Sequence, residues 1–277
     1  MSAEVVGALN PMPGKTIVDC TLGYGGHALA LLESGANVIG IDQDNEILKK
    51  VKERIPSNKN ITFFHGNFAD INNIIKTPVD GFLFDLGVSS FQIDEAGRGF
   101  SIRFDGPLDM RMDQGVGKPA SFYINNLTEE ELAKIFFEYG QERFSKRIAR
   151  RICAERLKKT ISTTFELKEI IEKAIPTWKK RESATRIFQA LRIFINSELN
   201  NLSQALSDSI SLLKSGGRIC VISYHSLEDR IAKNFFRKLK LDGILDVLTK
   251  KPMTAGEGEI VKNPRAKSAK MRIAEKI

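Results

Sequence analysis

Three acidic residues, Asp19, Asp42 and Asp85, stand where three short, β-rich runs end. The first is followed by a glycine-rich turn, Thr21 to His27, which leads into a helical pattern. Glycines in such a turn permit positive φ angles and let the backbone approach a ligand, and free N–H groups of the following helix can point at that ligand. A carboxylate placed like Asp42 can accept both hydroxyls of a ribose. The pattern therefore indicates a nucleoside cofactor.

Two nucleoside cofactors compete for this arrangement. Gly23, Gly25 and Ala28 give G-x-G-x-x-A, which is close to a dinucleotide fingerprint and makes an NAD-linked oxidoreductase the rival interpretation. However, Asp19 would oppose a pyrophosphate, whereas it could orient the ammonium group of a methionine moiety, and Asp85 suits a sulfonium cation or an amino group. The helical middle of the chain also leaves no second mononucleotide-binding half. We therefore favour S-adenosylmethionine, although a glycine turn needed only for packing stays open as an alternative.

The elements that position these residues follow from the apolar pattern. Short apolar runs separated by helical patterns are typical of parallel strands buried on both faces, and right-handed crossovers then give a doubly wound α/β sheet. The predicted strands are Thr16–Cys20, Val38–Asp42, Ile61–His65 and Gly81–Asp85, and the predicted helices between them are His27–Glu33, Asn45–Arg54 and Ile71–Ile75.

The alternation stops after Asp85. A loop rich in Gly, Asp and Arg, residues 97–117, precedes a helical stretch from Thr128 to about Leu213. Beyond the Gly216-Gly217 turn we expect a strand, Arg218–Ser223, and then a helix, Ser226–Leu239. Two further strands are expected at Ile244–Thr249 and Lys270–Glu275, with a loop between them at Thr254–Glu259. We therefore predict one α/β domain, residues 1–106 and 198–277, interrupted by an inserted helical substrate-recognition domain, residues 107–197.

Composition restricts the class of protein. The 277 residues include 42 Lys and Arg against 34 Asp and Glu, a formal charge of +8, which favours a polyanionic partner such as nucleic acid. No apolar run approaches the roughly 20 residues that span a bilayer, and the first nine residues lack the basic start of a signal peptide. The chain shows no cysteine or histidine spacing typical of a metal site or a disulfide; its cysteines are Cys20, Cys153 and Cys220, and its histidines are His27, His65 and His225. We therefore expect buried thiols in a metal-free, cytoplasmic protein.

One segment is strongly basic. Residues 143–159 carry eight basic residues and one acid, RFSKRIARRICAERLKK. On a helix, Phe144, Ile148 and Ile152 form an apolar stripe. The rest of that surface is then basic, with Arg143, Lys146, Arg147, Arg150 and Arg151. The segment is either a solvated face or an RNA-binding surface, which two further basic sets could extend: Lys179, Lys180, Arg181 and Arg186, and Lys262, Arg265, Lys267 and Lys270.

Several long motifs carry a family resemblance. They are DLGVSSFQ at 85–92, GRGFS at 97–101, DGPLDMRMD at 105–113, YGQERF at 139–144, TRIFQALR at 185–192, SYHSLEDR at 223–230 and NPRAKSAK at 263–270. With these motifs the chain resembles the RsmH (MraW) family from about Glu4 to its end. It departs from the family pattern at Glu182-Ser183, where His-Pro is usual, and in its shorter N-terminal segment.

The resemblance implies an S-adenosylmethionine-dependent enzyme that methylates the N4 amino group of a cytidine in the decoding region of 16S ribosomal RNA. It also implies a Rossmann-like, seven-stranded methyltransferase sheet with an inserted helical domain, and the small-subunit RNA or the small subunit as partner. The cofactor contacts that it implies are Gly25, Gly26, His27, Asp42, Phe68, Asp85 and Gln92.

A cytosine amino group needs help to react, because its lone pair is delocalised into the ring and a proton must be shed. An enzyme can supply hydrogen-bond acceptors and hold the reacting atoms in line. The acceptor candidates are Asp85, Asp109 and His225, with Ser89 and Tyr224 as helpers. Asp109 could equally pair with Arg111. The remaining alternative is a non-catalytic RNA-binding or assembly protein that keeps a methyltransferase fold.

Overall fold

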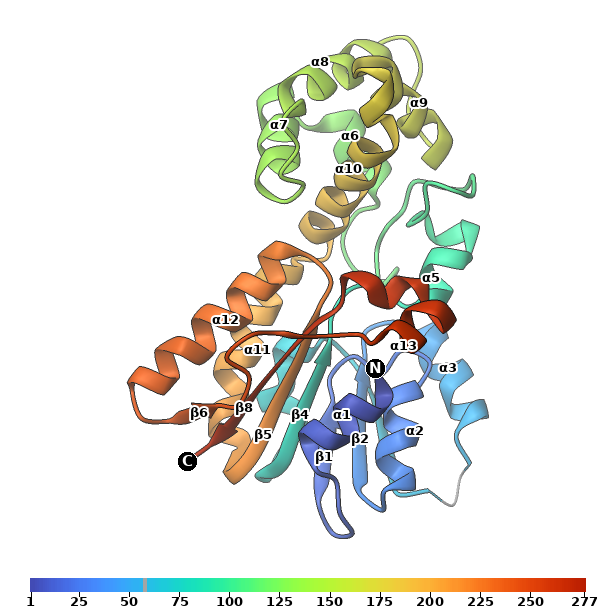
Figure 1. Cartoon of the computed structure of the whole chain (residues 1–277). Coiled ribbons are helices and arrows are strands. Elements are labelled where there is room, and N and C mark those ends of the chain that lie inside the picture. The colour runs from blue at the N-terminus through green and yellow to red at the C-terminus, as the bar shows by residue number, and fades with distance from the viewer. Residues whose placement is uncertain (57–58) are drawn as a thin grey trace. The chain divides into compact units, whose positions relative to one another are not determined.

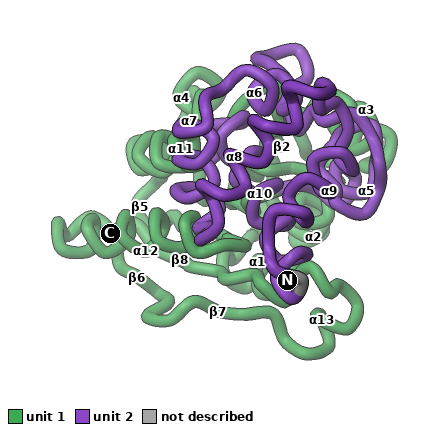
Figure 2. Tube along the Cα trace, turned by 90° about the horizontal axis from the view of Figure 1, so that it is seen from above, with its two compact units in different colours: residues 1–87, 199–277 green, residues 88–198 purple. Residues whose placement is uncertain are grey.

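The computed structural model describes residues 1–56 and 59–277. The chain forms two compact units, shown in different colours in Figure 2. Unit 1 comprises Met1–Gly87 and Leu199–Ile277, and unit 2 comprises Val88–Glu198. The sequence leaves unit 1 once and returns to it, so unit 2 is an insertion. The predicted substrate-recognition segment, residues 107–197, lies within unit 2, and its role stays a prediction.

A single twisted sheet forms the centre of unit 1 (Figure 1). Its strands lie in the order β3-β2-β1-β4-β5-β8-β6, and the short β7 pairs with β8. Strands β1 to β5 are parallel, whereas β8 runs antiparallel to β5 and β6. The bounds are β1 Thr16–Asp19, β2 Asn37–Asp42, β3 Ile61–His65, β4 Val79–Asp85, β5 Leu213–Ser223, β6 Leu245–Val247, β7 Met253–Thr254 and β8 Lys270–Lys276. The strand order reverses at β1, and such switch points are where open α/β sheets bind ligands.

Helices cover both faces of this sheet. Neighbouring strand residues face opposite ways, so Ile17 and Leu83 pack in one core cluster, with α1 to α3, while Val18 and Phe82 pack in the other, with α4, α11 and α12. This two-sided burial explains the unbroken apolar runs of the sequence. The helices of this unit are α1 Ser2–Leu9, α2 Gly26–Glu33, α3 Asn45–Arg54, η1 Phe68–Asp70, α4 Ile71–Ile74, α11 Glu198–Leu212, α12 Ser226–Leu241, α13 Glu257–Lys262 and η4 Pro264–Ser268. The first residue of α11, Glu198, belongs to unit 2.

Unit 2 is helical, with its own core. Leu132, Ile148, Leu167 and Leu191 are among the buried residues that α7 to α10 contribute. Both α7 and α9 start with a capping box, formed by Thr128 with Glu131 and by Thr163 with Glu166. In each box the side chain of one residue accepts a hydrogen bond from the backbone N–H of the other. The elements are α5 Ser90–Asp94, η2 Ala96–Arg98, α6 Ala120–Asn126, α7 Glu129–Glu138, α8 Ser145–Arg156, α9 Thr164–Ala174, η3 Thr177–Lys179 and α10 Lys180–Ile195.

The predicted Rossmann-like α/β fold class is confirmed, with eight strands in the described part of the chain where the family resemblance implied seven, and three local predictions were wrong. Strand β5 begins at Leu213, so the Gly216-Gly217 pair lies inside the strand, where the register against β4 shifts, and not in a turn before it. The predicted loop Thr254–Glu259 begins in β7 and ends in α13, which Ile260 anchors against the core. The three cysteines are free as expected, but Cys153 is only half-buried.

Candidate active site

The turn after β1 is built from two glycines in the left-handed region. Gly23 has φ 49° and Gly25 has φ 74°, and α2 begins directly afterwards at Gly26. A Cβ on Gly25 would lie 2.6 Å from a methyl group of Val51, so packing against α3 excludes a side chain there. A Cβ on Gly26 would meet no atom within 4 Å. The packing interpretation therefore accounts for Gly25, while Gly26 leaves open space at the start of the helix.

The three strand-end carboxylates of unit 1 lie at one edge of the sheet. Asp42, Asp19 and Asp85 are the last residues of β2, β1 and β4, which are neighbours in that order. Parallel strands bring their carboxyl ends to the same edge, so the acidic groups act on one another electrostatically. Three anions held together at a buried edge favour a cationic ligand.

Asp42 ties β2 to the glycine turn. Its Oδ2 accepts a hydrogen bond from the backbone N–H of Gly23 at 2.9 Å, and its Oδ1 accepts one from that of Asp44 at 2.9 Å. Burial raises the pKa of Asp42 to about 6, against the lowering effect of these two hydrogen bonds. Each carboxylate oxygen keeps a further acceptor site, so the group can still bind hydroxyls.

Asp19 is a buried carboxylate with one unsatisfied oxygen. The side chain is 1% exposed, and only Oδ1 accepts a hydrogen bond, from the N–H of Thr21 at 3.2 Å. Its Oδ2 has no partner in the described part of the chain. Burial raises the pKa of Asp19 to about 7, because the low-dielectric surroundings disfavour the charged form. A buried acceptor left in this state is suited to a hydrogen-bond donor or a cation of a ligand.

Asp85 is the centre of a polar cluster. The Tyr224 hydroxyl donates to Asp85 Oδ1 at 2.9 Å, and His27 Nε2 lies 3.2 Å from Asp85 Oδ2. The backbone N–H of Asp85 donates to the Thr21 hydroxyl at 2.7 Å. Burial lowers the pKa of His27, but the hydrogen bond and charge of Asp85 outweigh this, so the pKa is raised overall. Burial and the Asp85 charge raise the pKa of Tyr224 well above its ordinary value.

The whole sequence matches one known protein family. Residues 1–277 match the MraW methylase family. The chain belongs to this family. Similar proteins named "Ribosomal RNA small subunit methyltransferase H" come from Deinococcus deserti, 49% identical over 100% of this chain and 92% of that protein, and Syntrophotalea carbinolica, 45% identical over 100% and 96%. The resemblance that the motifs indicated is thus confirmed.

A solved structure supports the fold independently. A Streptococcus mutans methyltransferase in complex with SAH covers 100% of this chain and 98% of its own, with a TM-score of 0.52 and 13% identity. At that identity the likeness concerns the fold alone. The MraW methylase family and this architecture agree on a Rossmann-like methyltransferase sheet.

Two further cofactor contacts implied by the family resemblance are Phe68 in unit 1 and Gln92 in unit 2. Phe68 begins η1 and is half-buried, with its ring edge-on to Phe84 at 5.9 Å between centroids. Gln92 belongs to unit 2, where its side chain closes a capping box at the start of α5 by accepting the N–H of Ser89 at 3.0 Å. The structure thus groups the glycine turn, His27, Asp42 and Asp85 in unit 1. Their contacts with a cofactor stay predictions.

The other two catalytic candidates already have structural partners. Asp109 in unit 2 pairs with Arg111 through two hydrogen bonds of 2.7 and 2.9 Å, which lower the pKa of Asp109 although burial opposes this. His225 is the N-cap of α12, and its Nδ1 accepts the N–H of Glu228 at 3.4 Å. Of the three candidates, Asp85 alone lies in the cluster beside the glycine turn.

Sequence reasoning missed one participant in this cluster, Thr21, and gave another, Tyr224, only the role of a helper. Thr21 received no role, although its hydroxyl joins the turn to β4. Tyr224 was only a helper, although it links β5 to Asp85 across 139 residues of sequence. Its position offered a signal, because Tyr224 directly follows β5, the neighbour of β4.

The basic helix α8 packs as its pattern predicts. Ile148 and Ile152 are fully buried, while Arg147, Arg150 and Arg151 on the other faces are exposed. Arg150 lies 3.3 Å from Glu129, and Arg151 lies 2.8 Å from Glu155. Arg143 and Arg147 have no carboxylate partner among residues 1–56 and 59–277. Exposed ion pairs contribute little, so both kinds of arginine stay available to a phosphate.

Proposed function

We propose that this protein transfers a methyl group from S-adenosylmethionine to the N4 amino group of a cytidine in the decoding region of 16S ribosomal RNA. The observation that carries the proposal is the row of strand-end carboxylates beside a glycine turn, in a chain of the MraW methylase family. The name of its relatives supports a small-subunit RNA substrate. The partner is then the small subunit or its RNA, in the cytoplasm.

The residues of unit 1 fit such a cofactor. The unsatisfied Oδ2 of Asp19 suits the ammonium group of the methionine moiety, and Asp42 suits the ribose hydroxyls. The open space at Gly26, at the positive end of α2, suits the carboxylate of the methionine moiety. His27 flanks this space, and Phe68 and Gln92 complete the set. When bound, the cofactor supplies an electrophilic methyl group on a sulfonium.

Asp85 is the acceptor that the reaction needs. A cytosine amino group becomes nucleophilic when a carboxylate accepts a hydrogen bond from its N–H. Tyr224 and His27 hold the two oxygens of Asp85 in place from opposite sides of the carboxylate. Asp109 is held by Arg111 and His225 by its capping role, so these two are secondary candidates.

RNA recognition belongs to the inserted helices and their basic residues. In α8, Arg147, Arg150 and Arg151 are exposed on faces that do not pack into the core of unit 2, and Arg143, just before the helix, is exposed as well. Contacts with phosphates would fix the register of the RNA, while the extruded base and the RNA shape supply specificity.

The test is methyl transfer by the purified protein. Small subunits from a strain that lacks this modification are incubated with isotopically labelled S-adenosylmethionine, and the RNA is digested to nucleosides. We expect label in N4-methylcytidine. Binding calorimetry with NAD and with S-adenosylmethionine separates the oxidoreductase alternative. If S-adenosylmethionine binds tightly but no nucleoside becomes labelled, the result would favour the non-catalytic RNA-binding alternative.

A further inference from the structure

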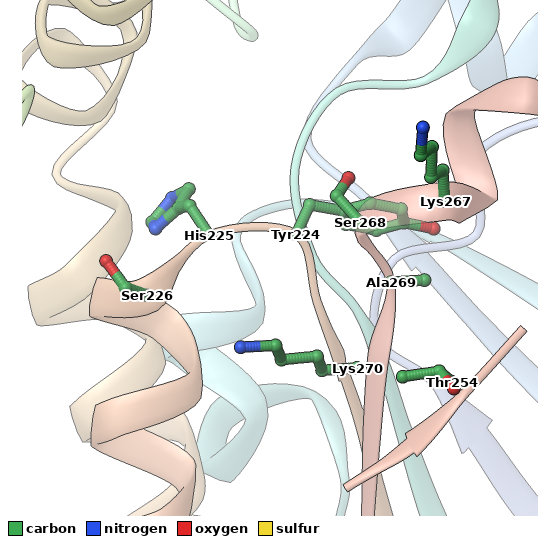
Figure 3. Close-up of a pocket in the computed structure, with 8 residues that line it drawn as sticks. All are labelled: Tyr224, His225, Ser226, Thr254, Lys267, Ser268, Ala269 and Lys270. Atoms are coloured by element: carbon green, nitrogen blue, oxygen red, sulfur yellow. The ribbon is translucent and has the colours of Figure 1, made fainter.

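A second concave site lies in unit 1, beside the Asp85 cluster. It is a pocket of about 240 Å³ between the end of β5, the start of β8 and the strand β7 (Figure 3). The residues that carry the argument are Tyr224, Ser226, Thr254, Lys267, Ser268 and Lys270. Figure 3 shows the Lys270 side chain extending toward the first turn of α12, where Ser226 lies.

The pocket has the donors of an anion site. Its lining includes two lysines and four hydroxyl side chains but no carboxylate in the described part of the chain. Lys267 and Lys270 are exposed and form no ion pair among the described residues. By contrast, Lys158, Lys173 and Lys240 each lie within 3.3 Å of a carboxylate oxygen. Two lysines left free at one concave site favour an anionic ligand.

Three acidic residues near this pocket in the sequence, Glu228, Asp229 and Glu259, have partners within the protein, and Glu259 pairs with the N-terminal amine of Met1 at 3.0 Å. The Glu228 carboxylate accepts the backbone N–H groups of Tyr224 and His225, at 2.9 and 3.3 Å. Asp229 pairs with Arg272 at 2.7 Å. The pocket also lies at the N-terminus of α12, a helix of 16 residues, whose dipole adds positive potential to that of the lysines.

The location of the pocket identifies the kind of anion. Tyr224 lines the pocket, and the hydroxyl of the same residue donates to Asp85. One side chain thus separates the pocket from the acceptor of the proposed reaction. Since a nucleotide in that reaction is tethered to backbone phosphates, a phosphate of the RNA chain is the anion that must come close to Asp85.

We propose that this pocket holds a backbone phosphate of the RNA next to the target cytidine, with Lys267 and Lys270 as its cationic ligands and the hydroxyls of Ser226 and Ser268 as further donors. The inference rests on the proposed function and deepens it. Lys267 and Lys270 are positioning residues, because they place the nucleotide and take no part in the transfer of the methyl group.

The double substitution Lys267→Gln and Lys270→Gln tests this. With small subunits as substrate, we expect KM to rise about tenfold or more while kcat and the Kd for S-adenosylmethionine stay within about twofold. The log–log salt slope of RNA binding should fall by about 0.7 for each lost contact. The matched control is Lys238→Gln. Lys238 is an exposed lysine in the last turn of α12, and its replacement should change neither KM nor the salt slope.

The outcomes separate this inference from the proposed function. If the wild-type protein forms no N4-methylcytidine, the proposed function fails. If the wild type is active and the double variant keeps its KM and salt slope, the pocket binds no RNA phosphate. A loss seen with intact subunits but not with naked RNA would assign the pocket to an acidic protein surface and overturn the inference. Unchanged thermal unfolding of the double variant excludes misfolding as the cause of a loss.

Discussion

Replacing Asp19 by Asn should stabilise the free protein and weaken cofactor binding at the same time. Asp19 is buried, and one of its oxygens has no partner within the described residues. Holding a charge there costs free energy in the free protein, and that cost is recovered only when a cationic group binds. A residue that served packing alone would not show these two opposite effects.

The magnitude follows from the pKa of Asp19. Burial raises it from 3.8 to about 7. At about 1.4 kcal/mol for each pH unit, ionising this group costs the folded protein on the order of 4 kcal/mol above pH 7. The cost is absent below about pH 4, where the acid is protonated in both the folded and the unfolded state, grows between about pH 4 and pH 7, and is constant above the folded pKa. The buried amide of Asn carries its own penalty of about 1–3 kcal/mol, so the net gain at pH 8 should be about 1–3 kcal/mol.

The assay is urea unfolding of both proteins at pH 8 and at pH 4.5, combined with calorimetric titration of S-adenosylmethionine. We expect the variant to be more stable at pH 8, to lose that advantage at pH 4.5, and to bind the cofactor about tenfold or more weakly, because a charge-assisted hydrogen bond is lost. Asp242→Asn, an exposed acid at the end of α12, is the control and should change neither property. A variant that is less stable than the wild type at pH 8 and binds the cofactor normally would refute this reasoning.

Three further outcomes are expected. Asp42→Ala should weaken S-adenosylmethionine binding at least tenfold in calorimetry, and an unchanged Kd would remove this residue from the cofactor site. Replacing Arg147, Arg150 and Arg151 together by Ala should lower the salt slope of RNA binding by about 2, with circular dichroism and cofactor affinity unchanged; wild-type RNA affinity would mean a merely solvated face. Tyr224→Phe should lower kcat about tenfold without changing cofactor affinity, since only the hydrogen bond to the acceptor carboxylate is lost; an unaltered kcat would count against that acceptor.

Much of the sheet could be predicted because its strands are buried on both faces. This holds for the central strands, such as β1 and β4, which appear as largely apolar runs, and the acids that end β1, β2 and β4 mark the edge where the strands stop. The glycine turn was recognisable because its residues lie between a predicted strand and a predicted helix. These are local signals, which the sequence carries within a few residues.

The polar cluster could not be predicted, because it depends on contacts far apart in the chain. Asp85 meets Tyr224 across 139 residues, and the burial that raises the pKa of Asp19 comes from the whole sheet edge. The partner of Arg150 is likewise distant, since Glu129 precedes it by 21 residues on another helix. Strand β5 was misjudged because the chain resumes pairing before the bulge at Gly216 and Gly217, a choice that its neighbour β4 imposes.

With the proposed function, this chain methylates a cytidine of the small-subunit RNA at the carboxylate edge of unit 1. The most direct measurement is mass spectrometry of 16S ribosomal RNA from a bacterial strain deleted for its own enzyme of this family and expressing this chain. We predict that one cytidine in the decoding region gains a methyl group at N4, and that Asp85→Ala abolishes this gain although the protein remains folded. RNA that stays unmodified with the wild-type chain, or a methyl group on another atom or another base, would contradict the account.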